Sequence, residues 1–111
     1  MGFREPDAAE LAARDCLWRL VNAYSRACDR RDFALLRSLY HDDALEEHGA
    51  MFTGTPDEYV VWVAKALANW QNTAHYVTNA LFEVAGDYAE GEIYKLNYHR
   101  TLDGAEEIVT G

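Results

Sequence analysis

The first part of the chain places apolar and polar residues with the spacing of an α-helix. Apolar positions recur every three or four residues over 8–28, which predicts a long amphipathic helix. Asp7 is its candidate N-cap, and Glu10, three residues on, occupies the partner position of a capping box. The apolar stripe of this helix consists of Leu17, Leu20, Val21, Tyr24 and Cys28.

Two further helices are predicted, each with a capping residue before it. Asp32 caps a short helix whose apolar positions are Phe33, Leu35, Leu36 and Leu39. The run Thr55-Pro56-Asp57-Glu58 combines a capping Thr, a Pro at the first helical position and a Glu at the third, and predicts a helix over 56–70. Between the two helices we expect a short strand over 44–47 and a turn over 52–54. The buried face of the later helix is expected to consist of Tyr59, Val60, Val63, Leu67 and Trp70.

The second half of the chain has the pattern of β-strands. Residues 75–84 and 88–101 are rich in Tyr, Val, Thr, Phe and Ile, and Gly86-Asp87 between them predicts a hairpin. Asp103-Gly104 predicts a second hairpin turn, which leads into a strand over 106–110. Helices first and strands afterwards indicate an α+β domain with the helices on one face of a curved antiparallel sheet.

Length and charge narrow the classes of function. The 111 residues, of which half are apolar, have the size of a single domain over 1–111. Nineteen acidic residues against ten basic ones give a net charge of -9, which disfavours nucleic acid and anionic membrane surfaces as partners. No apolar stretch long enough for a leader or a membrane span follows Met1, so we expect a cytoplasmic protein.

Neither a disulfide nor a metal site is expected. Cys16 and Cys28 lie several turns apart on one predicted helix, so their sulfur atoms cannot meet. The sequence contains no Cys-x-x-Cys and no His-x-x-x-His pair, which are typical spacings of metal ligands. We therefore expect no metal and no other cofactor.

The candidate catalytic chemistry lies in four histidines and one aspartate. Of His41, His48, His75 and His99, the last two lie at similar distances from the predicted hairpin turn, so adjacent strands would bring them toward a common pocket. Each is otherwise an ordinary half-buried or surface histidine. Asp29 closes the first helix, where the helix dipole disfavours a carboxylate. Either a neighbouring arginine neutralises this carboxylate or it accepts a hydrogen bond from a histidine.

Three stretches of the sequence resemble the SnoaL-like branch of the nuclear transport factor 2-like superfamily. They are YSRACDRRDF at 24–33, LRSLYHDDA at 36–44 and TAHYVTN at 73–79, and the similarity extends over 9–111. The similar groups are scytalone dehydratase, lindane dehydrochlorinase, bile-acid dehydratase and the small subunits of ring-hydroxylating dioxygenases. The resemblance implies a cone-shaped α+β barrel, in which three N-terminal helices pack on a strongly bent antiparallel sheet around an apolar pocket.

The resemblance also implies roles for particular residues. Dehydrating members have an Asp at the end of the first helix and a His at the start of the strand after the third helix, which correspond to Asp29 and His75. The scytalone dehydratase pattern adds a second pocket histidine, here His99, and a pocket tyrosine, whose place is taken by His48. The bile-acid dehydratase pattern has a tyrosine ahead of the Asp, which matches Tyr24. The resemblance thus implies catalytic roles for Asp29, His75 and His99 and substrate contacts from Tyr24, His48, Phe52 and Trp70.

Three classes of function are open as hypotheses. The first is a cofactor-independent lyase that removes water, or a comparable leaving group, from a small cyclic apolar substrate. The second is an isomerase, a cyclase or a small-ligand-binding protein without catalysis, and the third is a structural small subunit like that of the ring-hydroxylating dioxygenases. Members of the branch usually continue for about two more strands, so we expect the C-terminal strands to be missing and a homo-oligomer, a trimer or a dimer, to cover the sheet.

Overall fold

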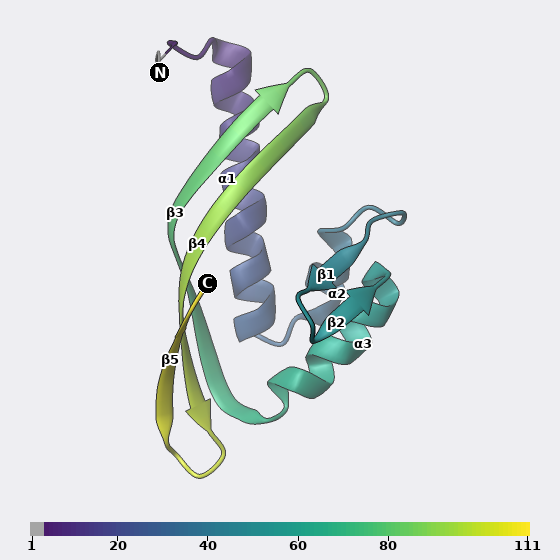
Figure 1. Cartoon of the computed structure of the whole chain (residues 1–111), viewed down its shortest axis with the longest axis vertical. Helices are drawn as coiled ribbons and strands as arrows, with labels where there is room; N and C mark the ends of the chain where they lie inside the picture. The colour runs from purple at the N-terminus through teal and green to yellow at the C-terminus, as the bar shows by residue number, and fades with distance from the viewer. Residues whose placement is uncertain (1–3) are drawn as a thin grey trace.

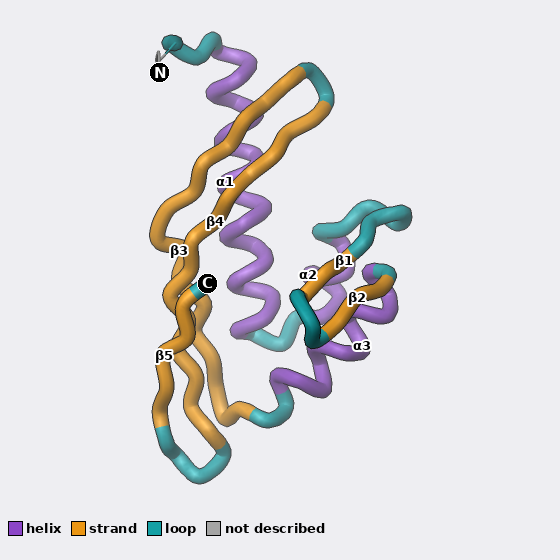
Figure 2. Tube along the Cα trace, viewed as in Figure 1, coloured by secondary structure: helices purple, strands orange, loops and turns teal. Residues whose placement is uncertain are grey.

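The computed structural model describes residues 4–111, which form three helices and two antiparallel sheets. The molecule is elongated, with principal extents of 50 × 29 × 24 Å. Figure 1 shows the long helix beside two long strands, a third strand along the lower part of that pair, and the two shorter helices grouped with the two short strands on the right; Figure 2 shows the same arrangement by type of element. In chain order the elements are α1 (Ala8–Asp29), α2 (Phe33–Ser38), β1 (Glu46–His48), β2 (Phe52–Gly54), α3 (Pro56–Leu67), β3 (Trp70–Ala85), β4 (Tyr88–Thr101) and β5 (Glu106–Thr110).

Each helix begins at the capping residue that the sequence predicts. The side chains of Asp7 and Asp32 each accept a hydrogen bond from the backbone N–H three residues on, at 2.8 and 3.1 Å. Before α3 the capping box is complete, because Thr55 accepts from the Glu58 N–H at 3.2 Å and Glu58 Oε1 accepts from the Thr55 N–H at 3.0 Å. Local capping chemistry therefore fixes where all three helices start.

The long sheet has the strand order β3-β4-β5, and both connections are hairpins. Gly86 in the first hairpin has φ of 60°, a left-handed conformation that glycine adopts without steric cost. The register places Thr73 opposite His99 and His75 opposite Asn97. Because side chains alternate between the two faces of a strand, these four residues share the face of the sheet on which α1 packs.

The hydrophobic core lies where the C-terminal half of α1 meets α2 and α3. Its largest fully buried side chains include Tyr59 of α3 and Leu36 of α2. Partly buried aromatic residues from α3 and the β1–β2 hairpin pack around this centre. The buried apolar members are Ala27, Cys28, Leu36, Tyr59, Val63 and Leu67.

Over residues 4–111 the sheet does not close into the predicted cone-shaped barrel. A barrel closes when the two edge strands of one sheet meet, but here β3 and β5 remain the edges of a three-stranded sheet, and β1 and β2 form a separate two-stranded sheet. The three helices also do not pack together on the sheet. Helix α1 covers the long sheet, whereas α2 and α3 pack mainly against each other, α1 and the short hairpin. The observed fold is therefore α+β with an open, curved sheet (Figure 1).

Several predicted element boundaries are wrong. Residues 52–54, expected as a turn, form strand β2, because they pair with 46–48 in antiparallel register. Helix α3 ends at Leu67 instead of reaching Trp70, and the Asn69 side chain donates to two carbonyl oxygens of its last turn. Trp70 consequently opens β3, which begins earlier than the predicted strand. Within residues 4–111, no helix has the length and apolar content needed to span a membrane.

Candidate functional site

The end of α1 determines where Asp29 lies. Arg31 comes after the helix in a left-handed conformation, with φ of 55°, and its N–H donates to the Cys28 carbonyl at 3.2 Å. The N–H of Asp32 donates to the Ala27 carbonyl at 2.9 Å, which completes a Schellman motif. The motif terminates the helix just after Asp29, whose side chain is directed toward β3.

Asp29 and His75 are in direct contact. Asp29 Oδ1 lies 2.5 Å from His75 Nδ1, and Oδ2 accepts the backbone N–H of His75 at 2.9 Å. The hydroxyl of Thr73 donates to Oδ1 at 3.0 Å. The two contacting side chains are mostly buried, with 24% of Asp29 and 13% of His75 exposed. The carboxylate is thus held by one imidazole, one backbone amide and one hydroxyl.

The same contacts set the charge state of the pair. Burial raises the pKa of Asp29, but hydrogen bonds from the side chain and backbone of His75 outweigh it, so the pKa of this carboxyl lies below its ordinary value. An ionised carboxylate at Nδ1 keeps the proton of a neutral imidazole on that nitrogen. The Nε2 atom of His75 is then the nitrogen with a free lone pair.

The alternative of direct neutralisation by an arginine is not what the structure shows. Among residues 4–111, Asp29 forms an ion pair with His75 and none with Arg26, Arg30 or Arg31. Arg31 acts through an intermediate, because its Nη1 donates to the Thr73 hydroxyl at 2.8 Å and that hydroxyl donates to Asp29. The Arg31 guanidinium also donates to the carbonyls that end α1 and α3, at 2.7 and 3.3 Å, and thereby ties both helices to β3.

His99 lies beside the pair without touching Asp29. Its ring centroid is 5.9 Å from that of His75 and 4.6 Å from that of Trp70. Its Nδ1 is 3.3 Å from Glu107 Oε1 on β5. The hairpin therefore does bring His75 and His99 together, as the sequence predicts, and Trp70 covers His99.

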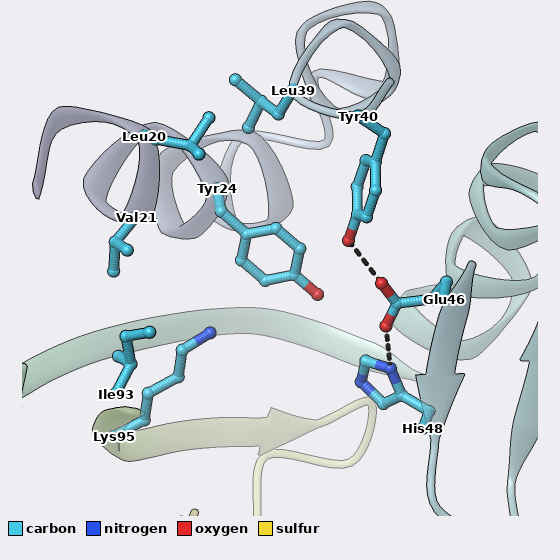
Figure 3. A pocket seen from close by; sticks show the side chains of 9 residues that line it. All are labelled: Leu20, Val21, Tyr24, Leu39, Tyr40, Glu46, His48, Ile93 and Lys95. Atoms are coloured by element: carbon cyan, nitrogen blue, oxygen red, sulfur yellow. Dashed lines mark hydrogen bonds and ion pairs between the residues drawn. The ribbon is translucent and has the colours of Figure 1, made fainter. Parts of the chain in front are cut away.

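A cavity of about 350 Å³ lies between α1, the loop after α2, β1 and β4 (Figure 3). Its volume is within the range of small-molecule sites. Apolar side chains from α1 and β4 form much of the wall, and a row of polar groups faces them. The lining residues are Leu20, Val21, Tyr24, Leu39, Tyr40, Glu46, His48, Ile93 and Lys95.

The polar wall of the cavity contains a second carboxylate–imidazole pair. Glu46 accepts a hydrogen bond from the Tyr40 hydroxyl at 2.7 Å, and its other oxygen lies 2.6 Å from His48 Nδ1 (Figure 3). Burial and the bond to Glu46 raise the pKa of Tyr40 above its ordinary value. His48 also stacks on Tyr59, with 5.3 Å between ring centroids. The polar side chains on this side of the cavity are therefore already bonded to one another.

Tyr24 stands on the opposite side of the cavity. Its hydroxyl is hydrogen-bonded to that of Tyr59, and burial is the main reason why its pKa lies above the ordinary value. The Lys95 Nζ atom lies 4.3 Å from the centroid of the Tyr24 ring. At neutral pH the cavity wall thus contains the neutral phenols of Tyr24 and Tyr40 and the amino group of Lys95, in addition to the Glu46–His48 pair.

The predicted site residues fall into two neighbouring groups. Tyr24 and His48 line the cavity. The predicted catalytic residues Asp29, His75 and His99 lie outside its lining, further along the same face of the sheet. Two predicted substrate contacts also lie elsewhere, since Phe52 packs on Tyr59 and Trp62, and Trp70 packs on His99. The remaining histidine, His41, is exposed in a loop.

Sequence reasoning missed three polar residues of the cavity, Tyr40, Glu46 and Lys95. One of them had a detectable signal, because Lys95, Asn97 and His99 alternate along one predicted strand and must share a face. Tyr40 and Glu46 had none, since they lie in a loop and a three-residue strand whose orientation depends on packing. Among the described residues, no group of three or more His, Cys, Asp or Glu side chains is arranged to hold a metal ion.

Comparison with protein families matches residues 9–111 to the SnoaL-like domain. The chain belongs to this family. The SnoaL-like domain is part of the nuclear transport factor 2-like superfamily, so the family relationship predicted from the three sequence stretches is confirmed. No curated protein sequence gives a significant match.

Solved structures resemble this SnoaL-like domain closely in fold at low sequence identity. LinA is 25% identical with a TM-score of 0.81, over 91% of this chain and 71% of its own. The hexachlorocyclohexane dehydrochlorinase LinA-type3 from Novosphingobium barchaimii LL02 is 23% identical, with a TM-score of 0.84 over 95% of this chain and 75% of its own. A putative scytalone dehydratase from Novosphingobium aromaticivorans DSM 12444 is 20% identical, with a TM-score of 0.83 over 92% of this chain and 70% of its own.

Proposed function

We propose that this SnoaL-like domain is a cofactor-independent lyase that eliminates water, or a comparable leaving group, from a small cyclic substrate. The observation that carries the proposal is the 2.5 Å contact between Asp29 and His75, in which a mostly buried carboxylate orients an imidazole. A carboxylate–imidazole pair of this kind is an effective general base, because the carboxylate stabilises the imidazolium that forms.

His75 would remove a proton from the carbon next to an activating carbonyl group. The proton goes to Nε2, and the electron pair of the broken C–H bond moves toward the carbonyl oxygen. The pair then returns to form a C=C bond while the C–O bond of the leaving hydroxyl breaks. The proton that His75 took is returned to the departing hydroxide, directly or passed on through His99, so that water leaves and both imidazoles regain their starting state.

Neighbouring groups would support these steps without a cofactor. Tyr24 remains protonated because burial raises its pKa, so its hydroxyl, which is hydrogen-bonded to that of Tyr59, is a neutral polar group at the cavity wall. His99 lies 5.9 Å from His75 between ring centroids, close enough for both to act on one small ring. The apolar wall of the neighbouring cavity would hold the rest of the substrate ring away from water.

The family relationship agrees with elimination chemistry. Two of the similar structures are described as a hexachlorocyclohexane dehydrochlorinase and a putative scytalone dehydratase, and both names denote elimination reactions. Their structural similarity indicates a shared fold, but their sequence identity to this chain is low. The proposed reaction therefore rests on the Asp29–His75 geometry.

A proton-exchange assay tests the base without knowledge of the natural substrate. The probe is β-tetralone, a bicyclic ketone with acidic hydrogens beside its carbonyl, incubated in deuterated buffer and monitored by NMR. We expect the native protein to accelerate exchange, His75→Ala to reduce it to the uncatalysed rate, and Asp29→Asn to lower it by about 10²–10⁴-fold.

His41→Ala is the matched control, because His41 is an exposed loop histidine away from the cavity. It is expected to exchange the probe as fast as the native protein. Circular dichroism of every variant establishes that the fold is retained. Equal exchange in native protein and in folded His75→Ala contradicts the proposal.

The second candidate function is ligand binding without elimination. One observation favours it: the residues that line the cavity do not include Asp29, His75 or His99. A ligand confined to that cavity would not meet the base. Saturable binding of β-tetralone together with no exchange above background would support this second function.

A further inference from the structure

Lys95 lies at the cavity wall and has no oxygen partner among the residues that the structure describes. Its ammonium points into the space between α1 and β4, and the Tyr24 ring lies beneath it at 4.3 Å (Figure 3). Within residues 4–111 no hydrogen bond or ion pair engages this Nζ atom. The aromatic face attracts the positive charge but offers no oxygen acceptor to the three N–H donors.

The acidic groups near Lys95 are engaged by other side chains. Burial lowers the pKa of Lys95, while Cys28, Glu46 and Asp29 act in the opposite direction. Glu46 is held by Tyr40 and His48, and Asp29 by His75 and Thr73. The ammonium therefore feels both carboxylates at longer range without bonding to either.

A second unpartnered polar atom lies further along the same strand. Asn97 alternates with Lys95 on the α1 side of β4 and faces His75 across the sheet. Its Oδ1 atom is buried and has no hydrogen-bond partner among the described residues. Two polar groups without a partner among the described residues thus lie on the same face of β4, one at the cavity and one beside the strand position of His75.

We propose that Lys95 binds an anionic oxygen of a cyclic ligand, such as a carboxylate or an enolate. This inference deepens the proposed function and rests on the cavity being the substrate site. Lys95 is partly buried, and partial loss of hydration without a partner is unfavourable for an ammonium; an oxygen anion is the partner that it binds most strongly in a site of low polarity. The apolar walls around it accept the rest of the ring.

The proposal narrows the substrate class. In the proposed elimination, negative charge develops on the carbonyl oxygen, and a fixed ammonium at that oxygen lowers the barrier. A ring that carries only apolar substituents would cover Lys95 without replacing its hydration, so it would bind poorly. We therefore expect an oxygenated ring as the substrate instead of a purely halogenated one.

Binding of two matched naphthalene derivatives tests the role of Lys95. The probes are β-naphthoate, which is anionic at neutral pH, and β-naphthamide, its neutral counterpart of similar shape, both measured by isothermal titration calorimetry. We expect the native protein to bind the anion about tenfold to a hundredfold more tightly than the amide. Lys95→Met is expected to abolish this preference while it retains affinity for the amide.

The control is Lys65→Met, because Lys65 is the other lysine of the sequence and is exposed on α3. It is expected to keep the native preference. An equal affinity of the native protein for both probes overturns the proposal, and so does a preference that survives in Lys95→Met. The probes have no leaving group, so these results are independent of whether His75 catalyses elimination.

A spectroscopic readout keeps the proposal testable if Lys95→Met fails to fold. Reductive methylation with isotopically labelled formaldehyde gives one NMR signal for each of the two lysines in the otherwise native protein. Saturating β-naphthoate is expected to shift the Lys95 signal and leave that of Lys65 in place. Unchanged signals from both lysines at saturation contradict binding at Lys95.

Discussion

At the scale of single residues, Asp29 shows how tertiary contacts compensate for an unfavourable local position. The last turn of a helix disfavours a carboxylate by up to about 1 kcal/mol. Here the side chain accepts hydrogen bonds from His75 Nδ1, the His75 backbone and the Thr73 hydroxyl, each a contact across more than forty positions of the chain. These hydrogen bonds stabilise the ionised carboxylate of Asp29 at a position where the helix dipole alone would disfavour it.

This compensation predicts a pH-dependent contribution to stability. The pKa of Asp29 is lower in the folded protein than its ordinary value of about 3.9, so the ionised carboxylate stabilises the fold above that pH. The contribution is lost as the pH falls through the lowered value. Asp29→Asn is expected to cost about 1–3 kcal/mol at neutral pH and to weaken the acid dependence of urea unfolding below about pH 4.

Asp57→Asn is the control, because Asp57 is an exposed residue at the start of α3. Asp57→Asn removes one negative charge without changing the Asp29–His75 pair. It is expected to leave most of the acid dependence of urea unfolding in place. An Asp29→Asn variant whose stability falls with acid as steeply as that of the native protein would contradict the assignment.

At the scale of elements, the caps determine where helices begin, whereas long-range pairing determines where strands begin. The capping box of α3 occupies four consecutive residues, but the start of β3 depends on a partner strand thirty residues away. Pro56 is itself fully buried beneath the capping box. The first turn of α3 therefore contributes to the core as well as to the helix.

This arrangement predicts the cost of removing the cap. Thr55→Ala eliminates the hydroxyl that accepts from the Glu58 N–H at 3.2 Å, and we expect the free energy of unfolding to fall by about 1 kcal/mol. Thr55→Ser retains the hydroxyl and is expected to stay within a few tenths of the native value. Chemical denaturation of the three proteins measures the difference, and equal losses in both variants would contradict a capping role.

At the scale of the whole molecule, one face of the long sheet is covered by α1 and the other is not. The uncovered face carries Tyr76, Tyr94, Leu96 and Ile108, which are 58%, 45%, 40% and 66% exposed. The register places Tyr76 opposite Leu96, so that apolar side chains adjoin across the strands. Exposed apolar surface of this kind is typical of protein–protein contacts.

We predict that this face mediates self-association into a dimer or a trimer. Leu96→Arg introduces a charge in the middle of the face and is expected to shift the sedimentation coefficient to that of a monomer at micromolar concentration. Because each copy carries a net charge of -9, added salt is expected to favour the native oligomer by screening repulsion.

Leu102→Arg is the control, since Leu102 is 71% exposed but lies in the turn between β4 and β5. It is expected to sediment like the native protein. A native protein that remains monomeric across the salt series would show that the uncovered face does not mediate self-association.

The sequence by itself determined the local features of this protein. Residues 88–101 and 106–110 form strands as predicted, because glycine-containing turns and β-rich composition act over a few residues. The three helix starts were predictable for the same reason, since a cap and its partner lie three residues apart. The family relationship, which rests on short stretches in a fixed order, was also readable, and it singled out Asp29 and His75, which are in contact in the structure.

Only the tertiary structure decided how these pieces meet. The cavity combines α1, β1 and β4, whose side chains share a space only after long-range packing, so Tyr40 and Glu46 gave no functional signal in isolation. Which residues Phe52 and Trp70 contact was decided by strand pairing, which places Phe52 against Trp62 and Trp70 against His99. The open sheet was likewise undetermined, because closure depends on which strand edges meet and not on the residues of any one strand.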